Sequence, residues 1–261
     1  MYTVASVPES VTIHRREAVA VVRIDRPKVN ALNTQVVAEL DEVCAEIEGD
    51  RSVRAAVVYG GERTFSAGAD LKEMAGGSPD DVRRRVGALQ KVCDRIAALP
   101  VPTIAAINGY ALGGGCEIAL ACDFRFASAT TRIGQPEIVV GLIPGAGGTQ
   151  RLPLLIGPAR AKWMIFTGDH VRADQALEWG LVDEVVEGDV LARALEQAAR
   201  FAAGPTLSLR AAKRAIAQAG RPGGYEVELD EFVGLFSTHD TRHGLESFQK
   251  EGPGRARFEG R

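Results

Sequence analysis

The sequence predicts an α/β fold, because short apolar runs typical of strands alternate with segments of helical periodicity. A β-branched run covers residues 18–25 and ends at an Arg-Pro pair, and a second apolar run covers 54–61. Between the two runs, apolar residues recur at helical spacing: Val36, Val37, Leu40, Val43, Cys44 and Ile47. The chain therefore begins with a strand, a helix and another strand.

The alternation continues to about residue 145. A helix is expected from about 80 to 99, followed by a short apolar strand over 101–109 that ends in the turn signal Asn108-Gly109. A run of three glycines then leads into a short helix, and the sequence DFRFAS at 123–128 is typical of another strand. This repeated order of strand and helix supports the α/β assignment.

The last third of the chain is predicted to be helical. Helical patterns follow one another, most of them ended by glycine, and only 181–186 is expected to be extended. These patterns cover 147–157, 158–168, 172–180, 190–204, 206–220, 225–236 and 241–248. We therefore divide the chain into a core, 1–195, and a helical C-terminal region, 196–261. The tail from residue 250 is rich in glycine and charge, and is expected to be mobile unless a partner surface orders it.

Composition restricts the class of function. A chain of 261 residues with 46% hydrophobic residues can bury a substantial core, and a net charge of −3 argues against a nucleic-acid partner. Residues 1–27 lack the pattern of a targeting signal, and no run approaches the roughly 18 apolar residues of a membrane span. Four widely spaced cysteines without a CxxC pair indicate reduced core thiols. We expect a cytoplasmic protein without membrane segments.

The glycine run at Gly113 to Gly115 is the first candidate for chemistry. Without side chains, the backbone N–H groups at the start of a helix are free to face a ligand, and the helix dipole favours negative charge there. The run fits an oxyanion site. A tight turn, in which a strand packs closely on a helix, is the more common explanation of such a run, so the run alone is a weak signal.

Two glutamates lie in apolar surroundings. Glu117 is part of YALGGGCEIALACD and Glu137 is part of IGQPEIVVGLIPGAGG. Each alone is more often structural, for example as a residue favoured in the first turn of a helix. If the fold brings both to one water molecule, however, burial and mutual repulsion would separate their pKa values, so that one accepts a proton while the other donates one.

The stretch RTFSAGADLKEM at 63–74 is the third candidate. Its small residues follow a predicted strand and permit close backbone approach, so it is able to supply a second N–H group to the same oxyanion. Ser66 is not expected to be a nucleophile, since the G-x-S-x-G pattern is not met and no histidine lies in a partner motif.

Four blocks together carry a family resemblance. RPKVNALN, TFSAGADLKEM, YALGGGCEIALACD and GQPEIVVGLIPGAGGTQRL resemble, in order and spacing, the enoyl-CoA hydratase/isomerase (crotonase) superfamily from about Val19 to Val186. The resemblance implies a crotonase-like spiral of β-β-α repeats with a C-terminal helical trimerisation region. It also implies an acyl-CoA substrate, no metal or redox cofactor, and a homotrimer or dimer of trimers.

The resemblance assigns roles by motif. Ala69 and Gly114 correspond to the two oxyanion-hole N–H groups, and Glu117 and Glu137 to the glutamates that hold and activate water. Gly145 corresponds to a glycine whose amide helps to hold that water. We take Glu137 as the proton donor to Cα and Glu117 as the base-side partner, although a shared water leaves the division of roles open.

Further positions are assigned to substrate binding. Ala67, Asp70, Leu71 and Lys72 correspond to the strip that lines the CoA and pantetheine path, and Gly113 lies beside the oxyanion site. The tail departs from the more continuously basic ending of many hydratases. The expected CoA phosphate contacts are therefore Arg26, Lys28 and Lys72, each of which equally fits a solvated surface charge.

A metal site is not expected. His239 and His243 share an i, i+4 spacing, but a site needs at least a third ligand, and Asp240 is expected to point elsewhere. The resulting hypothesis is a 2-enoyl-CoA hydratase, because both glutamates are present. A Δ3-Δ2 enoyl-CoA isomerase, another acyl-CoA enzyme of the same fold and a non-catalytic acyl-CoA-binding protein remain alternatives.

Overall fold

The computed structural model describes residues 10–261. The expectation that the N-terminus carries no targeting signal therefore lies partly outside the described residues, since 1–9 are not among them. Within 10–261, no helix combines the length and the apolar character that crossing a bilayer requires.

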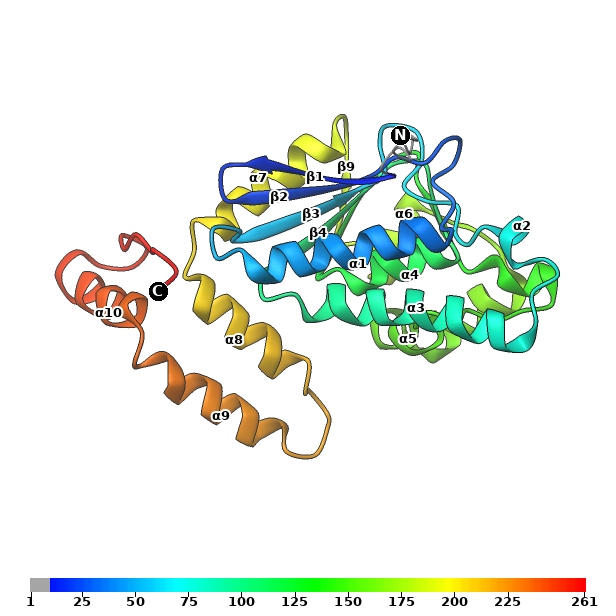
Figure 1. Ribbon diagram of the computed structural model, residues 1–261. Helices are drawn as coiled ribbons and strands as arrows, with labels where there is room; N and C mark the ends of the chain where they lie inside the picture. The colour runs from blue at the N-terminus through cyan, green and yellow to red at the C-terminus, as the bar shows by residue number, and fades with distance from the viewer. Residues whose placement is uncertain (1–9) are drawn as a thin grey trace, which may run out of the picture.

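A six-stranded sheet forms the centre of the molecule (Figure 1). Its order is β1-β2-β3-β4-β6-β9, in which β1 pairs with β2 antiparallel and every other pair is parallel. The strands are β1 (Val11–Arg16), β2 (Val19–Ile24), β3 (Ala55–Tyr59), β4 (Thr103–Ile107), β6 (Phe124–Ser128) and β9 (Glu184–Val186). The central strands β3 and β4 are buried throughout, which is why they read as continuous apolar runs.

A smaller sheet gives the fold its spiral. It consists of β5 (Tyr110–Leu112), β7 (Arg132–Gly134) and β8 (Val171–Arg172), and Ser66 extends it by a bridge to Ala111. In the turn β4-β5-α4 the chain passes from the large sheet to the small one and then into a helix, and β6-β7 is followed by a helix in the same way. The predicted α/β fold with its spiral of β-β-α repeats is confirmed. The first strand, β1, and the short strands β5, β7 and β8 were not predicted.

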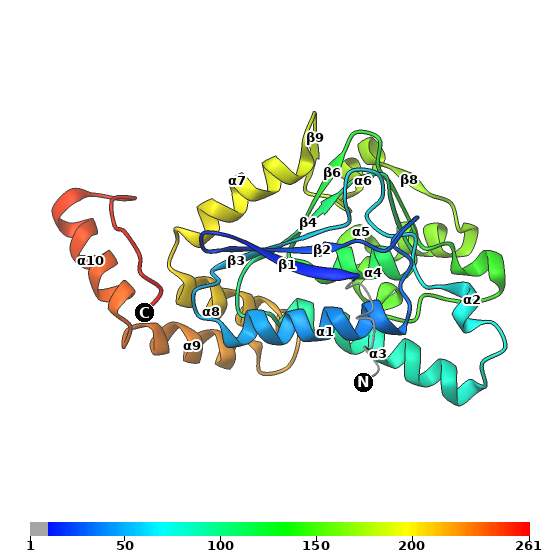
Figure 2. The same ribbon diagram turned by 45° about the horizontal axis from the view of Figure 1, so that its top comes forward.

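Helices cover both faces of the large sheet (Figures 1 and 2). On one face lie α1 (Thr34–Gly49), α3 (Pro79–Ala98) and α4 (Gly114–Ala121), which contribute to one continuous apolar core. On the other face α7 (Val190–Ala202) packs its buried alanines, Ala194, Ala198 and Ala202, against a second apolar cluster. The boundary placed at 195/196 falls inside α7, and the division into two regions stays a prediction.

Four further helical segments lie before α7 in the chain. They are α2 (Leu71–Met74), the 3-10 helix η1 (Pro136–Val140), α5 (Gly148–Thr167) and α6 (Ala173–Trp179). The two helices expected over 147–168 form α5, which is kinked at Gly157, where φ is 78° and ψ is 157°. Residues with a side chain rarely adopt that backbone conformation, so glycine permits the chain to change direction there.

The C-terminal helices extend away from the core (Figure 1). They are α8 (Thr206–Ile216), α9 (Gly224–Leu235) and α10 (His239–Glu251). An ion pair between Lys213 and Asp123, with 2.8 Å between nitrogen and oxygen, ties α8 to the core. The helical C-terminal region predicted from the sequence is present.

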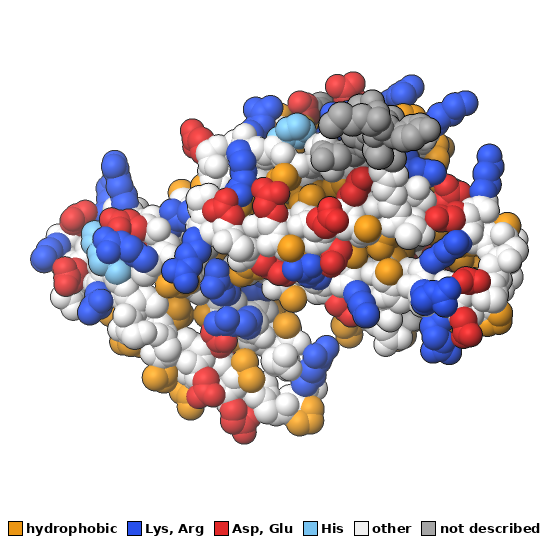
Figure 3. All heavy atoms as spheres, viewed as in Figure 1, with side chains coloured by type: hydrophobic (Ala, Val, Ile, Leu, Met, Phe, Trp, Pro, Cys, Tyr) orange, Lys and Arg blue, Asp and Glu red, His pale blue; other side chains and the backbone are white. Residues whose placement is uncertain are grey.

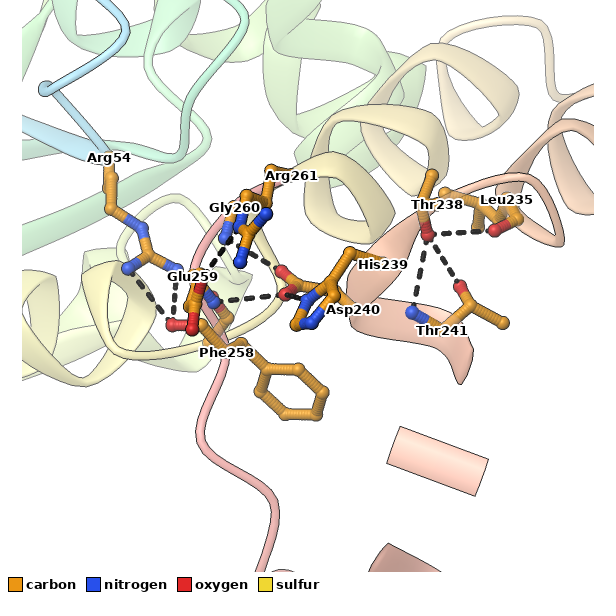
Figure 4. A network of polar contacts seen from close by, with 11 residues as sticks. Arg54, Leu235, Thr238, His239, Asp240, Thr241, Phe258, Glu259, Gly260 and Arg261 are labelled. Carbon is orange, nitrogen blue, oxygen red and sulfur yellow. Dashed lines mark hydrogen bonds and ion pairs between the residues drawn. The ribbon is translucent and has the colours of Figure 1, made fainter. Parts of the chain in front are cut away.

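The end of the tail is held by its own chain, which differs from the expectation (Figure 4). The Arg54 guanidinium donates to the Phe258 carbonyl at 3.2 Å and to the Gly204 carbonyl at 2.6 Å. The buried carboxylate of Asp240 accepts the N–H groups of Glu259 and Gly260 at 2.9 and 2.7 Å. Composition alone could not indicate these contacts, because their partners lie far away in the sequence.

Candidate active site

The glycine turn before α4 agrees with both interpretations of the glycine run, as a closely packed turn and as a candidate oxyanion site. Gly113 has φ 52° and ψ −125°, and its N–H donates to the Gly134 carbonyl at 2.9 Å. A Cβ on Gly113 would lie 2.9 Å from Oε1 of Glu137, and one on Gly115 would lie 2.5 Å from the Ser66 carbonyl oxygen. Side chains are therefore excluded by close packing, while α4 begins at Gly114 with its first N–H groups free of side-chain caps.

The facing loop is held by Asn30 and Ser66. The Ser66 hydroxyl donates to the Asn30 carbonyl at 2.7 Å and accepts from the Gly68 N–H at 3.2 Å. The Asn30 amide nitrogen donates to the carbonyls of Thr64 and Phe65 at 2.9 and 3.2 Å. The Ser66 hydroxyl thus helps to fix the conformation of the loop, in agreement with the argument against a nucleophilic serine.

The two N–H groups assigned to the oxyanion hole lie beside each other. A Cβ on Gly114 would lie 3.8 Å from the backbone nitrogen of Ala69. Across residues 10–261, neither N–H donates to a backbone or side-chain acceptor. Free, adjacent amides are the arrangement that stabilises negative charge developing on a bound oxygen.

One cavity of about 310 Å³ contains these amides and both glutamates. Its remaining wall is largely apolar and is supplied by the loop before α2, by α2, α3 and η1, and by the loop that follows η1. Among the positions assigned to substrate binding, four line this cavity and two, Asp70 and Lys72, do not. The four are Ala67, Leu71, Gly113 and Gly145.

Glu117 is almost completely buried, with 2% of its surface exposed. Its Oε1 accepts hydrogen bonds from the N–H groups of Ala146 and Gly148 at 2.6 and 2.8 Å. Burial raises the pKa of Glu117 above its ordinary value, while these two N–H groups and Arg151 act in the opposite direction. The carboxylate therefore does not cap its own helix but faces the cavity at the start of α5.

Glu137 belongs to η1 and lies in a different environment. Burial raises its pKa to about 7; its own backbone N–H lowers the pKa and the negative charge of Glu117 raises it further. The completely buried side-chain amide of Gln135, oriented with its nitrogen toward Glu137, donates to the two carboxylate oxygens at 3.1 and 3.2 Å. The structure thus brings the two predicted glutamates to one cavity with unequal electrostatics.

The three residues expected to contact the CoA phosphates differ in their exposure and in their ion pairs. Arg26 forms an ion pair with Asp70, with 2.8 Å between nitrogen and oxygen, and Asp70 also caps α2 by accepting from the Lys72 N–H at 3.1 Å. The Asp70 carboxylate is therefore engaged outside the cavity. Lys28 and Lys72 have exposed side chains.

The histidine pair does not form a metal cluster. His239 and His243 stack with ring centroids 5.9 Å apart, and the Asp240 carboxylate is turned toward the tail amides. Across residues 10–261, no group of three His, Cys, Asp or Glu side chains is arranged to hold a metal ion.

The geometry agrees with comparisons to known proteins. A family model described as enoyl-CoA hydratase/isomerase matches residues 14–260. The chain belongs to this family. The match extends beyond the stretch 19–186 on which the resemblance rested, and it includes the C-terminal helices.

Relatives support this assignment over nearly the full length. The chain is 42% identical to a short-chain-enoyl-CoA hydratase of Clostridium acetobutylicum, covering 92% of this chain and 94% of that protein. It is 39% identical to a crotonyl-CoA hydratase of Syntrophomonas wolfei, covering 92% and 95%. A crystal structure of an enoyl-CoA hydratase from Bacillus anthracis is similar with a TM-score of 0.91 at 37% identity, covering 97% and 100%.

Sequence reasoning missed several contributors to the site. The Ala146 and Gly148 amides that bind Glu117 belong to the motif GAGG at 145–148, whose glycines at the start of a helix are a signal of the same kind as Gly113 to Gly115. Gln135 had only a weak signal, as a polar residue immediately before Pro136 in a largely apolar block. No sequence pattern indicated that its amide would face Glu137.

Proposed function

We propose that the protein is a 2-enoyl-CoA hydratase that adds water to a 2-enoyl-CoA and yields a 3-hydroxyacyl-CoA. The observation that carries the proposal is one cavity lined by the buried Glu117, the half-buried Glu137 and two adjacent free N–H groups. Relatives named as short-chain-enoyl-CoA and crotonyl-CoA hydratases support the choice of reaction within the family.

In the proposed mechanism, the N–H groups of Ala69 and Gly114 bind the thioester carbonyl oxygen. Attack of water on Cβ moves the electrons of the double bond toward Cα and the thioester, so negative charge develops on this oxygen. Fixed amide donors stabilise that charge, and losing one such donor typically lowers the rate on the order of 10²–10³-fold.

Glu117 and Glu137 are proposed to divide the proton transfers. Ionised Glu117, supported by the Ala146 and Gly148 N–H groups, takes a proton from the attacking water. Protonated Glu137, whose pKa is raised to about 7, donates a proton to Cα as the enolate collapses. A proton passed from Glu117 to Glu137 through the next water restores the starting state.

We propose that this reaction needs neither a metal nor a redox cofactor, since the CoA thioester is a substrate and adding water moves no electrons to or from an external carrier. We also propose that the protein acts in the cytoplasm. Four free, buried cysteines are consistent with a reducing compartment.

A homotrimer or dimer of trimers is the proposed assembly. Exposed apolar side chains gather on the C-terminal helices, where Figure 3 shows them along the lower edge of the molecule. They include Ile216, Tyr225, Leu229, Phe232, Val233 and Phe236. Exposed apolar side chains that gather on neighbouring helices indicate association sites, so light scattering that reports a stable monomer would contradict the assembly.

The reaction is tested by the loss of crotonyl-CoA absorbance and by product identification across a panel of enoyl-CoA esters. Glu117→Gln and Glu137→Gln should each lower kcat by about 10²-fold or more, whereas Glu46→Gln, at an exposed position of α1, should not. Unchanged turnover in both site variants would contradict the mechanism. Conversion of 3-enoyl-CoA without hydration would identify an isomerase, and binding without product a non-catalytic protein.

A further inference from the structure

The side chain of Arg151 turns back toward the start of its own helix. Arg151 is the fourth residue of α5, and its Nη1 donates to the Ala146 carbonyl at 3.2 Å. A Cβ on Gly147 would lie 3.1 Å from the Arg151 Cζ, so the guanidinium lies directly over this turn. Its Nη2 forms an ion pair with Asp94 of α3, with 2.6 Å between nitrogen and oxygen. The guanidinium is therefore fixed between α3 and the loop that leads into α5.

A cation at this position opposes the electrostatics of a helix N-terminus. The first N–H groups of a helix carry partial positive charge, which favours anions there and disfavours cations. The buried Glu117 supplies an anion, because its Oε1 accepts from the N–H groups of Ala146 and Gly148. The Asp94 side chain is 68% exposed, so water screens its charge more strongly. A neutral Glu117 would leave the helix start and Arg151 as two positive charges that face each other.

Ala146 connects Arg151 to Glu117. Its N–H donates to the Glu117 Oε1 at 2.6 Å, and its carbonyl accepts from the Arg151 Nη1 at 3.2 Å. One residue thus contacts the carboxylate with its donor and the guanidinium with its acceptor. Displacing the guanidinium would therefore also displace the amide that binds the carboxylate.

The other titratable groups around Glu117 supply no positive charge. Glu137 of η1 lines the same cavity and is itself acidic. The thiols of Cys93 on α3 and Cys116 on α4 also lie near Glu117, but burial raises the pKa of both, so they stay neutral. Burial raises the pKa of Glu117 too, and Arg151 is the only cation in the described part of the chain that acts against this rise.

We propose that Arg151 is a positioning residue that keeps Glu117 ionised for its role as the base. Its hydrogen bond to Ala146 fixes the turn whose amides bind the carboxylate, and its charge balances the charge of that carboxylate. The inference rests on the proposed function, in which an ionised Glu117 acts together with a protonated Glu137. It assigns the base role to Glu117, since no cation among the described residues acts on Glu137 in this way.

The test compares the pH dependence of kcat/KM for crotonyl-CoA in the wild type, Arg151→Gln and Arg151→Lys. Glutamine keeps a hydrogen-bond donor for the Ala146 carbonyl but carries no charge, whereas lysine keeps the charge. The matched control is Arg200→Gln, which removes one positive charge at an exposed position of α7, on the other face of the large sheet. Urea unfolding establishes that each variant is folded over the pH range of the assay.

The rate should rise on the acid side as Glu117 loses its proton, and fall on the basic side as Glu137 loses its own. We expect Arg151→Gln to move the acid side of this profile upward by about one pH unit, and so to lower kcat/KM there about tenfold. Arg151→Lys and Arg200→Gln should leave the acid side within about 0.3 pH unit of the wild type. A loss of activity in Arg151→Gln without this displacement, or an equal displacement in Arg151→Lys, would overturn the proposal.

Infrared spectroscopy provides a second measurement that needs no variant of Arg151. The difference between the spectra of the wild type and Glu117→Gln near neutral pH contains the bands of the Glu117 side chain, which should be those of a carboxylate. The band of a carboxylic acid would overturn the proposal even if the Arg151 variants did not fold. A wild type that hydrates no enoyl-CoA ester would instead refute the proposed function, and would leave the infrared result unaffected.

Discussion

The carboxylate of Glu117 lies at the N-terminus of α5, where the N–H of Gly148 donates to its Oε1 at 2.8 Å. The neighbouring Ala146 N–H donates to the same oxygen at 2.6 Å. The first N–H groups of a helix have no intrahelical partner, so a buried helix start needs an acceptor from elsewhere. Glu117 therefore has a structural role in addition to its proposed catalytic one.

This double role predicts a difference between two substitutions. Glu117→Ala leaves two buried N–H groups without an acceptor and should lower the free energy of unfolding by about 2 kcal/mol or more. Glu117→Gln keeps an oxygen in place and should be clearly less destabilising. Urea unfolding measures both, and equal losses of stability would contradict the structural role.

Glu137 predicts a dependence of stability on pH. Its pKa is raised from 4.5 to about 7 in the folded state, chiefly by burial. Between these values the folded protein binds more protons than the unfolded chain, so the free energy of unfolding falls as pH rises from 4.5 to about 7. Glu117, whose pKa is also raised, contributes with the same sign.

The contribution of Glu137 is isolated with Glu137→Gln, which cannot titrate. In this variant the decline of stability between pH 4.5 and 7 should become shallower than in the wild type. Urea unfolding at a series of pH values measures the slopes. Parallel curves for the two proteins would show that Glu137 is not protonated in the folded state near neutral pH.

The sequence predicted the parts of this structure that depend on local patterns. The buried strands β3 and β4 and the apolar stripe of α1 follow directly from residue type and spacing. The three short strands β5, β7 and β8 were missed, because strands of two or three residues are too short to display periodicity.

The site was also predictable only in part, because its geometry depends on contacts between residues that are distant in the sequence. Glu117 and Glu137 stand out as carboxylates in apolar runs, and the family resemblance paired them. Their unequal environments depend on Ala146, Gly148 and Gln135, whose positions relative to the carboxylates are set by tertiary packing. Likewise, the ion pair of Asp70 with Arg26 removes its carboxylate from the cavity despite its place in the motif.

Gly113 offers a test of how tightly the site is packed. A Cβ at this position would lie 2.9 Å from Oε1 of Glu137, so Gly113→Ala should displace the carboxylate and lower kcat by about tenfold or more. Gly113 has φ 52° and ψ −125°, outside the left-handed helical region, so alanine adds a backbone cost of roughly 1–3 kcal/mol. Gly220→Ala has φ 72° and no atom within 4 Å of the new Cβ, so it should carry the backbone cost without the loss of activity.

Steady-state kinetics on crotonyl-CoA, with urea unfolding of the same proteins, separates these two effects. A Gly113→Ala variant that is as active as Gly220→Ala would mean that Glu137 accommodates the methyl group without leaving its productive position. Urea unfolding gives the backbone cost of each alanine, so the loss of activity in Gly113→Ala is read separately from its loss of stability.

From the hydrogen bonds of Arg54 we predict that this residue keeps the tail attached to the core. Its guanidinium reaches the Thr206 hydroxyl at 2.7 Å, the Gly204 carbonyl at 2.6 Å and the Phe258 carbonyl at 3.2 Å, so it joins the core, the start of α8 and the tail. Hydrogen bonds to a charged donor of this kind contribute about 1.5–3 kcal/mol each. Arg54→Met keeps an apolar stem and removes the hydrogen bonds to all three acceptors, and should therefore release the tail.

Hydrogen exchange measures this release at the N–H groups of Glu259 and Gly260, which are bound to Asp240 in the intact protein. In Arg54→Met they should exchange about tenfold faster or more, because the tail opens without unfolding the sheet. The matched control is Arg51→Met, at an exposed position with the same change of charge, which should leave exchange as in the wild type. Unaltered protection at Glu259 and Gly260 in Arg54→Met would mean that Asp240 alone holds the tail.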